Sequence, residues 1–269
     1  FSLVFQPIVR LESGRPTGLE ALVRWVHPSV GPIGPDVFIP LAEETGLIVP
    51  LGRWILAEAC RAAVTWNAQP ALVDRIGVSV NLSPRQLEEP GLVASVREVL
   101  LETGLPPALL TLEITETGLV GTAGAIPDRL RDLKALGVSL AVDDFGTGYS
   151  SLGYIQHFPI DVLKIDRLFV EGLKRSGGHE AALARTIVGL GHSLGLRTVA
   201  EGIEVDAQRA ILSELGCALG QGYLFSRPLA SDDVLPWLAR ALDLPLPAFT
   251  GVRGTRPGRR TTGSMAAVA

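Results

Sequence analysis

The chain has 269 residues, of which 47% are hydrophobic and 19% charged, with 30 glycines and 19 prolines, a composition that excludes intrinsic disorder, a coiled coil and a collagen-like repeat. The formal net charge of −4 excludes a basic protein that binds a nucleic-acid polymer. Two cysteines, Cys60 and Cys217, exclude a disulfide scaffold and a CxxC zinc site, and no uncharged apolar run reaches the roughly 18 residues of a membrane-spanning helix.

Short β-rich segments alternate with helical segments along most of the chain. Strands are expected at residues 2–11, 19–26, 75–81, 109–115, 138–143, 161–165, 196–200 and 218–225, and helices at residues 49–66, 91–102, 126–136, 180–194, 206–215 and 234–242. The link around Ser13 and Gly14 is too short for a parallel crossover, so the first two strands should form an antiparallel hairpin. The other strands should be parallel, with helices outside, and eight strands in this length favour a closed (β/α)₈ barrel of the α/β class over an open sheet.

Two regions are expected: a barrel domain at residues 1–245 and a disordered tail at residues 246–269. The tail carries Arg253, Arg256, Arg259 and Arg260 and no acidic residue, so a basic tether to an anionic surface is the alternative. The sequence begins at Phe1 and its single methionine is Met265, so we interpret it as part of a longer protein. The scarcity of cysteine favours the cytoplasm for this domain and leaves open whether its parent is anchored in a membrane.

Polar side chains recur where the predicted strands end: Glu20, Asn81, Glu113, Asp143, Asp144, Lys164, Glu201 and Gln221. One such residue alone is best interpreted as a helix cap or a solvent-facing side chain. A whole series is better explained by an active site, because the carboxyl ends of barrel strands converge on one mouth. Asp143 and Asp144 would point to opposite faces within a strand, so both can serve one site only if the strand ends there, as Gly146 and Gly148 suggest.

Five carboxylates and one lysine cannot all be ionised in a half-buried mouth without bound cations. Oxygen ligands without a histidine cluster favour Mg²⁺ or Mn²⁺ over zinc. Two such ions, about 3.5–4 Å apart, would clamp a phosphodiester and activate water.

These residues lie within motifs that resemble those of the EAL domain family, bacterial phosphodiesterases of cyclic di-GMP. The motifs occur in the family order over residues 1 to about 240: Phe5-Gln6-Pro7-Ile8-Val9, Glu20-Ala21-Leu22, Phe38-Ile39-Pro40, Asn81-Leu82-Ser83, Leu112-Glu113-Ile114-Thr115-Glu116, Asp143-Asp144-Phe145-Gly146, Lys164-Ile165-Asp166, Ala200-Glu201-Gly202 and Gln221-Gly222-Tyr223. The resemblance implies a modified TIM barrel with an antiparallel first strand.

The resemblance also implies roles for the residues of the site. Glu20, Asn81, Glu113 and Asp143 would hold one metal, and Asp143 would bridge to a second metal that Asp144 also binds. Lys164 would touch the scissile phosphate and the attacking water, Gln221 would bind a water, and Glu201 would bind metal or its water, with its role as general base open. Leu22, Glu20 and Gln221 would belong to the substrate-binding group together with Arg24, which would contact substrate phosphate unless it is simply an exposed arginine at a strand end.

Glu116 would anchor the loop at residues 145–151, the alternative being an ordinary acid at a helix N-terminus near Gly118. In the family this loop lies at a dimer contact, so a homodimer is expected, along with sensory or GGDEF domains upstream. A helix commonly precedes the first strand in the family, and this sequence begins almost at that strand.

Three functions are compatible with these observations. The first is hydrolysis of cyclic di-GMP to linear pGpG by two-metal activation of water, which the complete set of expected side chains favours. The second is a receptor that binds the nucleotide without hydrolysing it. The third is an unrelated metal-dependent barrel enzyme, such as an aldolase or an enolase-like protein.

Overall fold

A closed barrel of eight strands forms the centre of the computed structural model, which describes residues 1–119, 126–146, 158–173 and 179–244. In order around the barrel, the strands are β1 (Ser2–Arg10), β2 (Pro16–His27), β4 (Gly77–Asn81), β5 (Leu110–Thr115), β6 (Ser139–Phe145), β7 (Val162–Ile165), β8 (Arg197–Ala200) and β9 (Leu219–Gly220). β1 is antiparallel to both of its neighbours, β2 and β9, and the remaining neighbours are parallel. The prediction of a modified TIM barrel with an antiparallel first strand is therefore confirmed.

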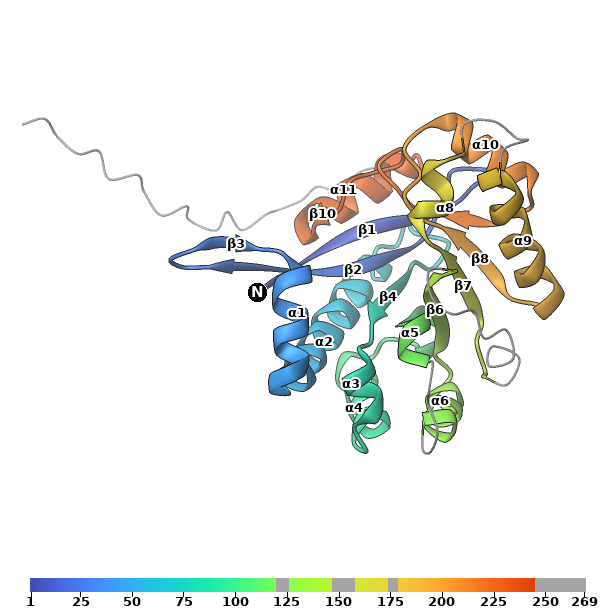
Figure 1. The fold of residues 1–269 in the computed structure, drawn as a ribbon. Coiled ribbons are helices and arrows are strands. Elements are labelled where there is room, and N and C mark those ends of the chain that lie inside the picture. Colours follow the sequence, from blue (N-terminus) through green and yellow to red (C-terminus); the bar gives the residue numbers. More distant parts are fainter. Residues whose placement is uncertain (120–125, 147–157, 174–178, 245–269) are drawn as a thin grey trace, which may run out of the picture.

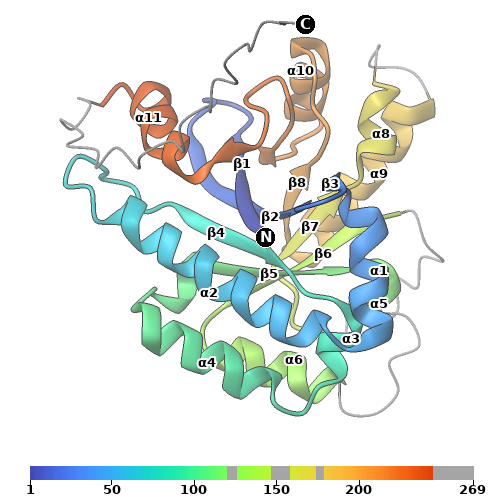
Figure 2. The ribbon, with the colours of Figure 1, turned by 90° about the vertical axis from the view of Figure 1, so that its left-hand side faces the viewer.

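The helices cover the outer surface of the barrel (Figures 1 and 2). They are α1 (Pro35–Thr45), α2 (Ile48–Asn67), α3 (Pro84–Glu88), α4 (Leu92–Thr103), the 3₁₀ helix η1 (Pro107–Leu109), α5 (Glu116–Leu119), α6 (Ile126–Ala135), α8 (Arg167–Glu171), α9 (His179–Leu194), α10 (Asp206–Glu214) and α11 (Ser231–Ala241). Apolar side chains fill the layer between helices and strands. Trp66 of α2, for example, is 1% exposed and meets the ring of Phe5 edge-on at 4.9 Å.

A second, smaller apolar cluster lies inside the barrel. It consists of Ile8, Ala141, Val162, Val199 and Leu219, each from a different strand. Because side chains alternate between the two faces of a strand, residues two positions from these also face the interior. That alternation brings Asp143, Lys164, Glu201 and Gln221 to the same side of the sheet as this cluster, and Glu113 joins them because it lies beside Ala141 in the β5–β6 register.

Several short elements differ from the sequence prediction. The helices α1 and α8 were not predicted. Nor were two short strands outside the barrel: β3 (Gly31–Ile33), which pairs with β2, and β10 (Leu229–Ala230), which pairs with β1. The last barrel strand was predicted at residues 218–225 but ends at Gly220. Gly222 follows with φ of 156°, and a Cβ there would lie 2.1 Å from the carbonyl oxygen of Ile203, so the chain turns sharply where the prediction extended the strand.

Two sequence predictions concern residues outside the described ranges. They are the disordered tail at 246–269 and the anchored loop after β6, of which residues 147–151 are not described. Within the described ranges, none of the helices combines the length and apolar character needed to cross a membrane.

Candidate active site

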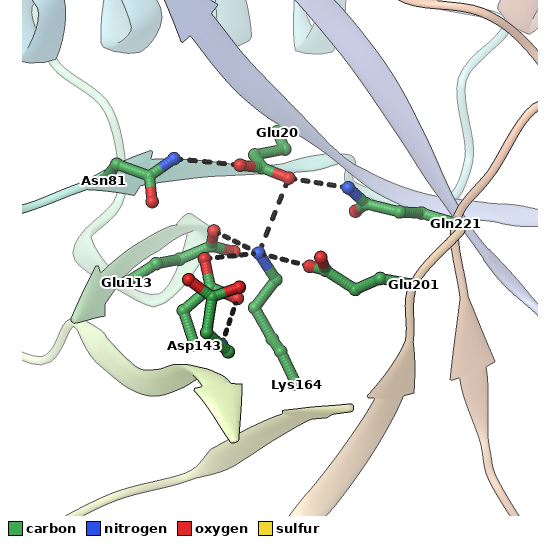
Figure 3. Close-up of polar contacts among 8 residues, drawn as sticks. Glu20, Asn81, Glu113, Asp143, Lys164, Glu201 and Gln221 are labelled. Carbon is green, nitrogen blue, oxygen red and sulfur yellow. Dashed lines mark hydrogen bonds and ion pairs between the residues drawn. The ribbon is translucent and has the colours of Figure 1, made fainter. Parts of the chain in front are cut away.

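The predicted polar residues meet at one mouth of the barrel (Figure 3). Strand pairing sets their positions, since Asn81 of β4 lies beside Glu113 of β5 and Thr115 of β5 lies beside Asp143 of β6. Most of the side chains are deeply buried, with exposed fractions of 5% for Glu20, 2% for Glu113, 8% for Asp143, 1% for Lys164 and 5% for Gln221. The structure therefore brings together residues that the sequence separates widely.

The ammonium group of Lys164 lies at the centre of this cluster. Its Nζ is 2.6 Å from Glu113 Oε2, 2.6 Å from Glu201 Oε1, 3.1 Å from Asp143 Oδ2 and 3.5 Å from Glu20 Oε2. One buried ammonium group therefore forms ion pairs with four carboxylates. This arrangement leaves the group with excess negative charge whenever all four are ionised.

Two amide side chains orient Glu20. Asn81 donates from Nδ2 to Glu20 Oε1 at 2.8 Å, and Gln221 donates from Nε2 to Glu20 Oε2 at 2.6 Å. Burial raises the pKa of Glu20, but the charge of Lys164 and these two hydrogen bonds outweigh it, so the pKa lies below its ordinary value. These contacts thus favour the ionised form of Glu20.

Glu113 and Glu201 have raised pKa values. Burial and repulsion from Glu20 and Asp143 hold the pKa of Glu113 well above its usual range, although Lys164 opposes the shift. Burial and the neighbouring carboxylates raise the pKa of Glu201 to about 8, also against Lys164. Although burial lowers the pKa of Lys164, the surrounding carboxylates raise it well above its ordinary value. The crowding of carboxylates predicted from the sequence is therefore present. A further bound cation would reduce the repulsion among them.

The carboxylates form two overlapping groups of three. Oxygen atoms of Glu20, Glu113 and Asp143 lie within 4.8 Å of one another, and so do oxygen atoms of Asp143, Asp144 and Glu201. Each group offers only oxygen ligands, which suit Mg²⁺ and Mn²⁺. Since Asp143 belongs to both groups, the geometry fits two neighbouring divalent cations that share one carboxylate.

The prediction that β6 ends before Asp144 is wrong. The strand continues to Phe145, and both aspartates serve the mouth because of a β-bulge. The pairing of β6 with β7 shifts by one residue between Val142 and Phe145, and Asp144 has φ of 54°. This left-handed backbone turns the Asp144 side chain back toward Asp143, a device that bulges provide beside active sites.

Arg24 and Leu22 line a cavity of about 440 Å³. The cavity is also lined by Asn81, Thr115 and Ser83, and Asn81 donates to Glu20, so the cavity adjoins the carboxylate cluster at Asn81. The Arg24 guanidinium is half-buried and donates to the carbonyl oxygen of its neighbour Val23 at 2.9 Å. The positions of both residues are compatible with contacts to a ligand in this cavity.

Glu116 lies outside the carboxylate cluster. Its Oε2 accepts a hydrogen bond from the backbone N–H of Gly146 at 2.9 Å, directly after β6. A residue that anchors the loop must make such a contact. That Glu116 anchors the rest of the loop, beyond Gly146, stays a prediction.

Two residues of the site were missed as functional candidates. Asp166 hydrogen-bonds to Asp144, whose pKa is raised to about 6 by burial, by the charge of Asp143 and by this hydrogen bond. Gln6 of β1 is buried and lies opposite Glu20 in the β1–β2 register. Strand periodicity could have found Asp166, because it lies two residues after Lys164, and the predicted hairpin could have found Gln6.

Comparison with known proteins relates this arrangement to characterised chains. The profile of the EAL domain family matches residues 1–228. The chain is 45% identical over 237 residues to the bifunctional diguanylate cyclase/cyclic di-GMP phosphodiesterase MucR of Pseudomonas aeruginosa, covering 88% of this chain and 34% of MucR. It is 44% identical over 227 residues to the cyclic di-GMP phosphodiesterase NbdA of the same species, covering 84% of this chain and 29% of NbdA.

Among solved structures, the chain resembles the PaMucR phosphodiesterase in complex with c-di-GMP. The TM-score is 0.81 at 45% identity, over 87% of this chain and 93% of that one. The chain spans about a third of the length of the two curated relatives.

Proposed function

Because the chain belongs to the EAL domain family, we propose that it is a metal-dependent phosphodiesterase that hydrolyses cyclic di-GMP to linear pGpG. The observation that carries this proposal is the pair of carboxylate groups that share Asp143 at the barrel mouth. Two carboxylate groups with a common member suit two-metal phosphodiester hydrolysis.

Glu20, Glu113 and Asp143 would hold one cation, and Asp143, Asp144 and Glu201 the other, with Asn81 contributing to the first. Divalent cations at these positions supply Lewis acidity toward a phosphoryl oxygen and lower the pKa of water. Mg²⁺ and Mn²⁺ both fit the oxygen donors, and we propose two ions of either kind.

The chain's own side chains then have separate tasks. Lys164 would neutralise charge on the reacting phosphate, Gln221 would orient Glu20 and a water molecule, and Glu201, with its pKa of about 8, is a candidate to accept a proton. Arg24 and Leu22 would bind substrate in the neighbouring cavity, where a guanidinium pairs well with phosphate.

The decisive experiment incubates the purified chain with cyclic di-GMP and Mn²⁺ or Mg²⁺ and follows pGpG by chromatography. We expect pGpG to form with either metal and to stop forming when a chelator is added. Glu20→Gln should lower turnover by at least about 100-fold, the scale of a lost catalytic interaction. Glu214→Gln, an exposed acid on α10, is the matched control and should retain activity.

Two results would contradict the proposal. Binding of intact cyclic di-GMP without pGpG formation in either metal would indicate a receptor instead. Full activity of Glu20→Gln would show that the carboxylate cluster is not the active site.

We further propose that the chain acts as a homodimer and forms part of a longer protein with sensory or GGDEF domains upstream, with this domain in the cytoplasm. MucR supports the multidomain part of this proposal, since its name combines a diguanylate cyclase with a phosphodiesterase and the chain matches 34% of its length. Size-exclusion chromatography with light scattering tests the dimer.

A further inference from the structure

The end of the barrel opposite the active site contains a second cavity, of about 410 Å³. Small residues line it on one half of the barrel, namely Gly18 of β2, Gly77 and Ser79 of β4, Thr111 of β5 and Ser139 of β6, whereas Ile8, Val162, Val199 and Leu219 of the interior apolar cluster line the other half. TIM barrels usually fill this space with bulky branched side chains. The half of the barrel built from β2, β4, β5 and β6 therefore leaves this end partly unfilled, and the cavity volume is in the range of small-molecule sites.

Four arginines line the same cavity: Arg10 at the end of β1, Arg15 in the turn before β2, Arg75 before β4 and Arg197 at the start of β8. The acids among the lining residues are Asp74 and Glu113, and Glu113 is buried and paired with Lys164. This concentration of positive charge contrasts with a chain whose net charge is −4.

Two of these arginines are already engaged. Arg15 makes a loose ion pair with Asp74 at 3.5 Å, and Arg75 donates to the backbone oxygen of Asn67 at 2.8 Å. Within the described ranges, by contrast, Arg10 and Arg197 have no carboxylate within ion-pair distance. Their guanidinium groups are available to a ligand.

Asp161 shows why Arg197 stays unpaired. The backbone N–H of Arg197 donates to the Asp161 carbonyl, so the two residues are neighbours. The Asp161 carboxylate, however, accepts two bonds from Lys134 Nζ at 2.8 Å and one from the backbone N–H of Leu140 at 2.8 Å. This neighbouring acid is thus hydrogen-bonded to other donors, and the charge of Arg197 is available to the cavity.

We propose that this end of the barrel binds a small molecule that carries a phosphate or pyrophosphate group, held by Arg10 and Arg197. Guanidinium groups pair with phosphate through parallel hydrogen bonds, and several arginines around one recess favour a multiply charged anion. The hydroxyl groups of Ser79, Thr111 and Ser139 supply further donors on the wall. Its arginines and hydroxyls lie outside the carboxylate cluster, and Glu113 of that cluster lines the inner end of the cavity, so the two sites are neighbours but the proposal does not rest on the hydrolysis.

The test is calorimetric titration of the metal-free protein, kept in chelator, with inorganic pyrophosphate. Saturable binding with a dissociation constant below about 1 mM is expected. Arg10→Gln/Arg197→Gln should weaken it by at least about tenfold, since charge-assisted hydrogen bonds are lost. Arg97→Gln on the exposed face of α4 is the matched control, and Arg24→Gln removes the arginine near the active site; both should bind like the unaltered chain.

A second probe identifies the kind of molecule. Tighter binding of ADP than of pyrophosphate would point to an organic phosphate, and equal binding to the phosphate group alone. Phenylglyoxal modification, mapped by mass spectrometry, should be slower at Arg10 and Arg197 when pyrophosphate is present, which tests the site even if the double variant does not fold. Absence of saturable binding, an unchanged affinity in the folded double variant, an equal loss in Arg97→Gln, or no protection of either arginine would overturn the proposal.

Discussion

Lys164 and the carboxylates around it are best understood as a single charged unit. Four acids lie within 2.6–3.5 Å of one ammonium group that is 1% exposed. Charges this deeply buried are tolerated only when opposite charges and hydrogen bonds compensate for lost hydration. Divalent cations would compensate the surplus acids and free Lys164 to interact with a phosphate.

The raised pKa values predict that metal binding depends on pH. Glu201 and Asp144, with pKa values of about 8 and about 6, hold protons that a metal must displace. The affinity for Mn²⁺ should therefore rise as pH increases from 6 to 8, by about tenfold per pH unit where one proton is displaced. Calorimetry in buffers of different ionisation enthalpy measures both the affinity and the protons released.

The variant Glu201→Gln removes the group that titrates near pH 8, so its affinity profile should be flatter between pH 7 and 8. An affinity for Mn²⁺ that stays constant from pH 6 to 8 would refute this account of the site's protonation.

Lys164 should contribute more to the chemical step than to substrate binding. Lys164→Ala should lower kcat by about 10²–10⁴, the range of positioned charge and proton-transfer effects, with a smaller change in KM. Steady-state kinetics at saturating Mn²⁺ separates the two. A change confined to KM would assign Lys164 to substrate binding alone.

At the scale of elements, buried polar side chains tie strands to helices. Asn67 at the end of α2 is 8% exposed and bonds to both backbone groups of Ile76, accepting from its N–H at 2.9 Å and donating to its carbonyl at 2.8 Å. It also donates to the Ala63 carbonyl at 2.8 Å. This side chain thereby fixes the approach to β4, the strand that carries Asn81.

Asn67→Ala should lower the free energy of unfolding by at least about 2 kcal/mol, because buried backbone groups of Ile76 lose their partners. Urea unfolding of the metal-free protein measures this loss. Gln69→Ala, two residues further on, is the control and should change stability by less than about 0.5 kcal/mol. Equal stability of the two variants would show that water replaces the Asn67 contacts.

The helices and strands differ in how well the sequence could predict them. Each long barrel segment was predictable, because an apolar run such as Leu110–Thr115 fits a strand with both faces covered. Short elements such as α8 carry too few residues for a periodic signal. The convergence of the acids followed from barrel topology. The bulge at Asp144, by contrast, depends on one residue in the left-handed region, and a glycine or asparagine at that position would have predicted such a conformation more clearly.

At the scale of the whole molecule, the carboxylate cluster connects segments of the barrel that lie far apart in the sequence. The two carboxylate groups draw on β2, β5, β6 and the residue that follows β8, so ligands come from both halves of the chain. A cation that binds these groups only in the folded barrel stabilises it by an amount that grows with the logarithm of its concentration, about 2.7 kcal/mol at 100 times the dissociation constant. Chelation should therefore lower the melting temperature of the protein as isolated with Mn²⁺.

Asp143 offers a sharper test of the shared-ligand geometry. Asp143→Asn should reduce the Mn²⁺-dependent rise in melting temperature more than Glu201→Gln does, because Asp143 belongs to both carboxylate groups and Glu201 to one. Differential scanning fluorimetry over a series of Mn²⁺ concentrations compares them, with Glu214→Gln expected to keep the full rise. If Asp143→Asn also kept the full rise, the two groups could not be sharing that carboxylate, and the cations would have to bind elsewhere in the barrel.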